Sequence, residues 1–298
     1  PNERFGRPAF KTILMAIAEL YRTQRAQVVE SSEQLLNMIK HKLLVSSEIQ
    51  ESIIDKGAST ILKSADTLYG GFGRAPKFPM AGAIEFLLSR YFFTRDESLA
   101  TMLRKTLTSM ARGGFHDHLA GGFHRYSTDQ SWIVPHFEKM ADDNAWLLRN
   151  YVDAYSIFGD PFFKDVAQGI INFTRNELSH PDGGFHTSQD ADVTPDDEGG
   201  YFTWTDNDFK TLLTDEEYTV LSKYFLHERA IMHHDSSKRV LYIDKNPEDV
   251  AEMIGMNVEK VNQIIIQGRR KLLHARETRT KPFVDTAMYS SLNSMYIS

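Results

Sequence analysis

Residues Gly113–Met140 read GGFHDHLAGGFHRYSTDQSWIVPHFEKM, and within them Gly-Gly-Phe-His occurs twice, the glycine pairs eight residues apart. Paired glycines allow tight turns and close approach of backbone, and aromatic side chains supply flat apolar surfaces. Similar Gly-Gly-aromatic segments stand at YGGFGRAPKFP, GGFHTSQDAD and EGGYFTWT. The recurrence predicts a repeated unit, a helix followed by a short β-hairpin, with the hairpins gathered at one end of a helical barrel.

Apolar residues recur at helical spacing through most of the remaining chain. Two apolar stripes, at residues 83–92 and 99–110, are separated by a short break that predicts an antiparallel helix pair. Asp160 before Pro161 is typical of a helix start. A closed double ring of helices requires roughly 300 to 400 residues, whereas about 250 follow the leading helices. The sequence therefore predicts a mainly α, incomplete barrel with short β-hairpins.

Composition excludes several classes of function. The chain has 298 residues, of which 41% are hydrophobic, and its 40 acidic residues against 34 basic ones give a net charge of −6. A chain with this balance and no basic stripe is a poor ligand for nucleic acid or anionic membranes. Its apolar stretches are too short to span a bilayer. The absence of cysteine excludes disulfides and thiol chemistry and fits a cytoplasmic location.

Four segments carry a resemblance to a known family: GGFGRAPKFP, GGFHRYSTDQSWIVPHFEKMADDNA, SQDAD and EGGYFTWT. In order and spacing they closely resemble the spermatogenesis-associated, thioredoxin-domain-containing family over nearly the whole chain. The resemblance implies a thioredoxin-like domain followed by an (α/α)6 toroid of the six-hairpin glycosidase type, related to sugar 2-epimerases. On this basis, residues 1–45 are a helical arm that follows an absent thioredoxin-like domain. Residues 46–298 are the N-terminal part of the barrel, truncated at its C-terminus.

Two positions depart from the family pattern. Leu292 stands where the family usually has tryptophan, and Ala141 with Asp142 replaces two bulky residues in EKMADDNA. The first change alters a residue that could line the family's pocket, and the second could widen or acidify it. An incomplete barrel also exposes apolar helix faces, so we expect self-association through them.

Histidines are the first candidates for catalysis. Sugar epimerisation needs a base that removes a proton beside a carbonyl and an acid that returns it on the opposite face, and histidine titrates in the suitable range. His124 and His136 are the candidate pair. His136 and Glu138, two residues apart, would share a face on a strand. The alternative is that both histidines hold the hairpins together through hydrogen bonds.

Carboxylates offer a second chemistry, because glycoside hydrolysis uses two of them on either side of the scissile bond. Asp190 and Asp192 alternate in SQDAD and are followed by Glu198, while Asp129 and Glu138 could also act as partners. The alternative is structural, since aspartates in loops commonly cap helices or close turns.

Aromatic residues in the same loops suit the apolar face of a sugar ring, and polar neighbours suit its hydroxyl groups. The same aromatic side chains could equally serve packing alone. The predicted substrate-binding residues are Phe123, Arg125, Tyr126, Asp129, Trp132, Asn144, Glu198, Tyr201 and Trp204.

No metal or cofactor is predicted. His116 with His118, and more weakly His233 with His234, invite a metal interpretation, but the usual zinc spacings are missing. No phosphate-binding glycine motif is present, so a nucleotide cofactor has no support. The leading hypothesis is a carbohydrate-active domain, epimerase-like or glycosidase-like, that acts on a sugar or glycoside. The alternative is a non-catalytic binding scaffold attached to a thioredoxin-like domain.

Overall fold

The computed structural model describes residues 8–43, 50, 52–194 and 197–297. The chain divides into two compact units, Pro1–Ile53 and Ile54–Ser298. The first contains helices α1 (Phe10–Thr23) and α2 (Arg25–Leu43), which contact each other. The apolar side chains of α1, including Ile13, Leu14 and Ile17, are exposed. This unit therefore has no core of its own among the described residues.

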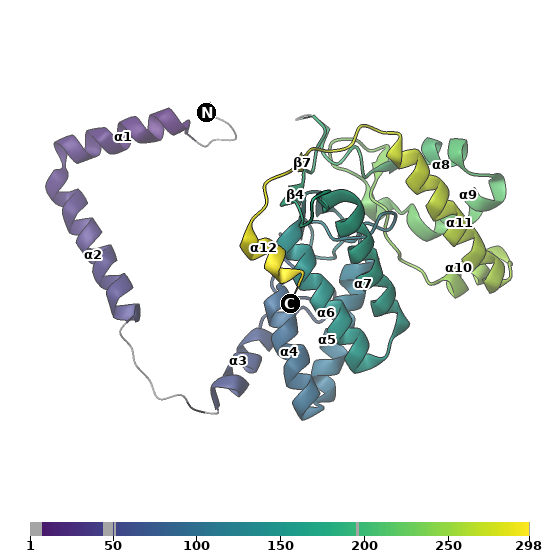
Figure 1. Ribbon diagram of the computed structural model, residues 1–298, viewed down its shortest axis with the longest axis horizontal. Helices are drawn as coiled ribbons and strands as arrows, with labels where there is room; N and C mark the ends of the chain where they lie inside the picture. Colours follow the sequence, from purple (N-terminus) through teal and green to yellow (C-terminus); the bar gives the residue numbers. More distant parts are fainter. Residues whose placement is uncertain (1–7, 44–49, 51, 195–196, 298) are drawn as a thin grey trace. The chain divides into compact units, whose positions relative to one another are not determined.

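Consecutive helices form the centre of the second unit (Figure 1). Helix α6 (Ala141–Phe158) packs against both α4 (Ala81–Thr94) and α7 (Pro161–Phe173), and α4 packs against α5 (Glu97–Arg112). Side chains at helical spacing, among them Leu87, Leu103 and Tyr151, are fully buried between them. Asp160 accepts a hydrogen bond from the Phe162 N–H, as expected for the cap of α7. The helices are α3 (Ser52–Leu62), α4 (Ala81–Thr94), α5 (Glu97–Arg112), α6 (Ala141–Phe158) and α7 (Pro161–Phe173), with a π-helical extension at Thr174–Leu178.

Short strands connect the helices at one end. The antiparallel pair β1 (Tyr126–Ser127) and β2 (Pro135–His136) joins α5 to α6. A three-stranded sheet has β4 (Ser188–Gln189) between β3 (Lys139–Met140) and β7 (Val284–Asp285). The predicted fold class, mainly α with short β-hairpins at the loop end, is confirmed.

A second group of helices lies between β4 and β7 in the chain. Its two ends are joined, because Asp190 donates its backbone N–H to the Phe283 carbonyl at 2.8 Å. The group buries its own apolar core. No helix among the described residues is both long and apolar enough to cross a bilayer. The elements are β5 (Trp204–Thr205), α8 (Asp206–Leu212), α9 (Asp215–Phe225), a 3-10 turn (Glu228–Ala230), β6 (Lys238–Arg239), α10 (Pro247–Ile254) and α11 (Val258–Glu277), and α12 (Ser290–Met295) follows β7.

Two of the glycine-rich turns have the same construction, and they begin at Asp66 and Asp117. In each, the aspartate Oδ1 accepts backbone N–H groups two and three residues later. The aspartate N–H donates to the carbonyl of the second glycine. A buried lysine completes each turn, since Lys77 Nζ lies 2.7 Å from Asp66 Oδ2 and Lys139 Nζ lies 2.7 Å from Asp117 Oδ2. The repeated sequence unit is therefore also a repeated structural unit.

The Asp117 turn has a third charge. Arg276, near the end of α11, donates two hydrogen bonds of 2.9 Å to the Asp117 carboxylate. Asp117, Lys139 and Arg276 are all at least 95% buried. Burial alone would raise the pKa of Asp117, but the charges of Arg276 and Lys139 outweigh it and hold this pKa well below its usual range. The triad therefore joins the part of the chain around the central helices to the group of helices between β4 and β7, here called the inserted group.

Asparagines near the start of two helices each hold one of the turns. Asn144 on α6 accepts the Phe123 N–H at 2.7 Å and donates to the Phe123 carbonyl at 2.9 Å. Asn293 on α12 makes the same pair with Phe185, at 2.7 and 3.0 Å. Because both backbone groups of the phenylalanine are satisfied by one side chain, the turn is fixed on the start of the helix.

Replacing Asp117 with asparagine should strongly destabilise the second unit. The substitution leaves Lys139 and Arg276 buried without a carboxylate, which costs about 3–5 kcal/mol in comparable buried pairs. Urea denaturation of Asp117→Asn measures the loss. Lys210→Gln is the control, because it removes an exposed Lys210–Asp206 pair and a surface contact with the Tyr218 ring and should change little. Equal stability of the two variants would contradict the importance given to the triad.

Replacing Asn144 with alanine should lower the free energy of unfolding by about 1–3 kcal/mol, because the buried Phe123 N–H and carbonyl lose their partner. Denaturant unfolding measures the change, with Asn262→Ala as a control at an exposed position of α11. A stability equal to that of the control would mean that the asparagine does not hold the turn.

Candidate functional site

The β1–β2 hairpin presents a polar surface made of Arg125, Tyr126, His136 and Glu138, here called the β1–β2 surface. From Pro135 to Met140 buried and more exposed positions alternate, as in a strand, so His136 and Glu138 lie on one side. Glu138 Oε2 accepts a hydrogen bond from Arg125 Nη1 at 2.8 Å and lies 3.7 Å from His136 Nε2. The Tyr126 and His136 rings stack, with centroids 5.0 Å apart.

A carboxyl group that the sequence analysis did not select lies next to this surface. Asp143 is in the first turn of α6. Burial raises its pKa to about 7, with further contributions from the charges of Asp142 and Glu138, while Arg125 acts in the opposite direction. A carboxyl group that exchanges its proton near neutral pH is suited to acid or base catalysis. The acidic pair in EKMADDNA was the available signal, but the burial of Asp143 is a tertiary property.

A second cluster of carboxylates, centred on Asp192, lies close to the β1–β2 surface. Burial raises the pKa of Asp192, although a hydrogen bond from the Gly199 N–H opposes the shift. The charges of Glu198 and Asp190 raise this pKa further, and that of His136 lowers it. Asp192 is therefore close enough to interact with Asp190, with Glu198 and with His136 of the β1–β2 surface.

His124 lies inside the protein and not on the β1–β2 surface. It is 2% exposed, and its Nδ1 is 2.7 Å from the Phe137 carbonyl oxygen. Burial, with the charge of Lys139, lowers its pKa to about 3, against an opposing contribution from Asp117. A neutral, buried imidazole of this kind is a poor proton donor at neutral pH. The structure therefore separates His124 from His136 and favours a packing role for His124.

His116 and His118 are also buried beside the Asp117 triad. Burial lowers the pKa of His118 to about 4, and its Nε2 lies 2.9 Å from the Gly113 carbonyl oxygen. Neither ring nitrogen of His116 has a hydrogen-bond partner. The small cavity that both histidines line, about 10 Å³, has room for about one water molecule. It is too small for a sugar.

Most of the predicted aromatic residues are core residues. Phe123, Trp132 and Trp204 are fully buried, and Tyr201 is 5% exposed. Phe123 stacks on Tyr151, and Trp132 donates its indole N–H to the Gly70 carbonyl at 3.3 Å. Tyr126 is the predicted aromatic side chain that reaches the β1–β2 surface.

Two predicted polar residues have structural contacts. Asp129 accepts backbone N–H groups of Ser131, Ile133 and Val134 and so holds the loop between β1 and β2. Asn144 holds the Phe123 turn. Both contacts match the structural alternative for loop side chains of this type.

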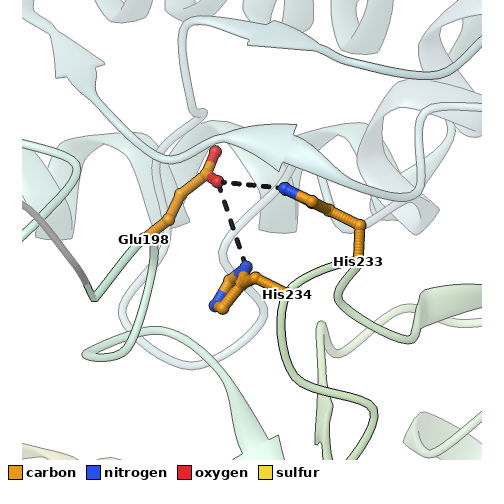
Figure 2. Close-up of side chains that lie close together, drawn as sticks. All are labelled: Glu198, His233 and His234. Carbon is orange, nitrogen blue, oxygen red and sulfur yellow. Dashed lines mark ion pairs between the residues drawn. The ribbon is translucent and has the colours of Figure 1, made fainter.

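One group of three side chains among the described residues has the composition of a metal site. Glu198, His233 and His234 place one ligand atom each within 4.8 Å of one another. Figure 2 shows both imidazoles directed at the Glu198 carboxylate. The sequence analysis noted the histidine pair, but Glu198 is brought to it only by the fold.

Comparison with solved structures gives remote similarities. A sugar epimerase from a ruminal bacterium matches with a TM-score of 0.42 and 14% identity, over 79% of this chain and 76% of that protein. Cellobiose 2-epimerase from Spirochaeta thermophila matches with a TM-score of 0.41 and 14% identity, over 47% of this chain and 39% of that protein. At this level of similarity, function has to be argued from the residues of the chain itself.

Comparison with known sequences gives closer relatives. Spermatogenesis-associated protein 20 of Homo sapiens is 34% identical over the whole chain, and an uncharacterised protein of Caenorhabditis elegans is 31% identical over the whole chain. The chain spans 42% and 44% of the length of these relatives. No protein-family model matches the chain. Identity of 34% over the whole chain shows that it is homologous to the corresponding part of spermatogenesis-associated protein 20.

Proposed function

We propose that this chain carries an acid–base site for a carbohydrate at the β1–β2 surface and the adjoining first turn of α6. The observation that carries the proposal is Asp143, whose pKa is raised to about 7 beside the Arg125–Glu138 ion pair. Pairs of titratable groups held in different environments are the usual source of acid and base roles in one site.

Each residue of the site has its own role in this proposal. Asp143 gives or takes the proton, and Glu138 supplies a second carboxylate, oriented by Arg125 at 2.8 Å. The partly exposed imidazole of His136 provides a further proton carrier in the same region. Tyr126 offers its ring as a stacking surface for a sugar, as aromatic side chains do in carbohydrate sites.

Two reaction classes fit these groups. In an epimerase, a base removes the proton from the carbon beside the sugar carbonyl, and an acid returns a proton on the other face. In a glycosidase, a carboxylic acid protonates the leaving oxygen while a second carboxylate acts on the sugar carbon or on water. The carboxylates Asp190, Asp192 and Glu198 extend the site in either case.

The thioredoxin-like domain and the cytoplasmic location expected from the family and composition stay predictions.

A non-catalytic scaffold is the second candidate. It is favoured by the burial of Phe123, Trp132 and Trp204, which leaves fewer aromatic rings for a sugar than the sequence predicted. A surface of this kind would bind a sugar or another polar partner without altering it.

Replacing Asp143 with asparagine should reduce turnover of a sugar substrate by at least about 100-fold, the usual contribution of a positioned proton-transfer group. The assay is proton NMR of reducing sugars and glycosides incubated in deuterated water with the chain. Deuterium beside the carbonyl identifies epimerisation, and new anomeric signals identify hydrolysis.

The matched control is Asp153→Asn, which removes an exposed carboxylate from the same helix and should leave turnover unchanged. Full activity in Asp143→Asn would remove Asp143 from the mechanism. If the unchanged chain alters no sugar but binds one, the scaffold becomes the better description.

The pH dependence of stability tests the state of Asp143 without a substrate. Because folding raises the pKa of Asp143 from 3.8 to about 7, the protonated group's contribution is fully present below about pH 4 and is lost as pH rises through 7. The unchanged chain should therefore lose on the order of 1–3 kcal/mol of unfolding free energy between pH 5 and pH 8, and Asp143→Asn should not show this loss. Urea unfolding at pH 5 and pH 8 measures it, and parallel behaviour of both proteins would contradict the raised pKa.

A further inference from the structure

Two turns of the inserted group bring Glu198, His233 and His234 together. Glu198 lies just before the Gly199–Gly200 pair, and the two histidines lie in the hairpin that leads into β6 (Figure 2). His233 Nε2 is 3.8 Å and His234 Nδ1 is 4.0 Å from the same oxygen, Glu198 Oε2. All three side chains remain accessible to solvent.

These separations are close to those of metal ligands. Zn²⁺ binds imidazole nitrogen at about 2.0–2.1 Å and carboxylate oxygen at about 2.0–2.2 Å in tetrahedral geometry, which places neighbouring ligand atoms about 3.3–3.5 Å apart. The two distances to Glu198 Oε2 exceed this range by about half an ångström, and all three ligand atoms lie within 4.8 Å of one another. Because the side chains are partly or largely solvent-accessible, rotations about their side-chain bonds can bring the ligand atoms closer.

The backbone around the three residues is well supported. Lys238 Nζ forms a 2.8 Å ion pair with Asp197, so it ties the Glu198 turn to the histidine hairpin beside the three ligands. Asp192 accepts the Gly199 N–H at 3.0 Å, and Asp235 accepts the Ser237 N–H at 2.9 Å. These contacts in both ligand-bearing segments reduce the entropy lost when a metal ion orders the side chains.

The local charge also suits a cation. Asp192 lies close enough to Glu198 for their charges to interact. The cation Lys238, in the segment that follows the histidines, is already paired with Asp197. Two imidazoles with one carboxylate prefer zinc and neighbouring transition metals, whereas Mg²⁺ and Ca²⁺ prefer sites made of oxygen ligands.

We propose that Glu198, His233 and His234 form a binding site for a divalent transition-metal ion of the zinc type. Three protein ligands leave the fourth tetrahedral position for water or for an anionic group of a partner. A bound ion would cross-link the Glu198 turn to the histidine hairpin. This inference does not depend on the carbohydrate proposal, since Glu198 is the one side chain that the two share and metal binding is tested without a sugar.

Isothermal titration of the chelator-treated chain with ZnCl₂ at pH 7.5 tests the site. One Zn²⁺ should bind per chain and raise the melting temperature, because the ion binds the folded state. Binding should weaken at pH 5, where protons compete for the ligands. Mg²⁺ under the same conditions should not bind. His234→Ala and Glu198→Gln should each weaken Zn²⁺ binding at least about 10-fold, the lower range for disturbance of a metal site.

The matched control is His180→Ala, because His180 forms an exposed histidine–carboxylate pair with Asp182 at 4.0 Å that belongs to no group of three ligands in the described chain. This variant should bind Zn²⁺ as the unchanged chain does. Absence of binding by the unchanged chain would overturn the proposal. Undiminished binding in Glu198→Gln or His234→Ala would also overturn it, by showing that the ion is held elsewhere.

Discussion

The second unit depends on one buried carboxylate. Asp117 accepts backbone N–H groups of its own turn and, at the same time, hydrogen bonds from Lys139 and Arg276. An isolated charge would not be tolerated at such burial, so each member of the triad requires the others. The turn after α5, the strand β3 and the end of α11 are therefore held at fixed distances although they are far apart in sequence.

This constraint also positions the candidate acid–base site. Lys139 points into the protein toward Asp117, so the alternation of the strand directs Glu138 to the opposite side, toward Arg125. The first turn of α6 follows directly, and there Asp143 is buried enough for its pKa to rise to about 7. The same short segment therefore places Lys139 against Asp117 inside the protein and Glu138 beside Arg125 on the β1–β2 surface.

The segment between β4 and β7 carries a second cluster of polar side chains. It closes the Asp117 triad through Arg276 and also carries Glu198, His233 and His234 on two adjacent turns. The charge of Asp192 interacts both with Glu198 of this region and with His136 on the β1–β2 surface. Carbohydrate chemistry and metal binding would thus occupy neighbouring parts of one loop-end face, each supported by separate contacts.

Local patterns determined the elements of this protein, and long-range packing determined which residues reach its surface. Helical spacing, the Asp160 cap and the recurring glycine pairs predicted helices and turns because these depend on neighbours in sequence. The pairing of His136 with Glu138 followed from strand alternation for the same reason. Burial could not be predicted from the local sequence, and His124 and Trp132 lie in the core. Asp143 and the Glu198–His233–His234 group were identified only from the tertiary structure. Desolvation and ligand distances depend on residues from remote segments, which no local pattern specifies.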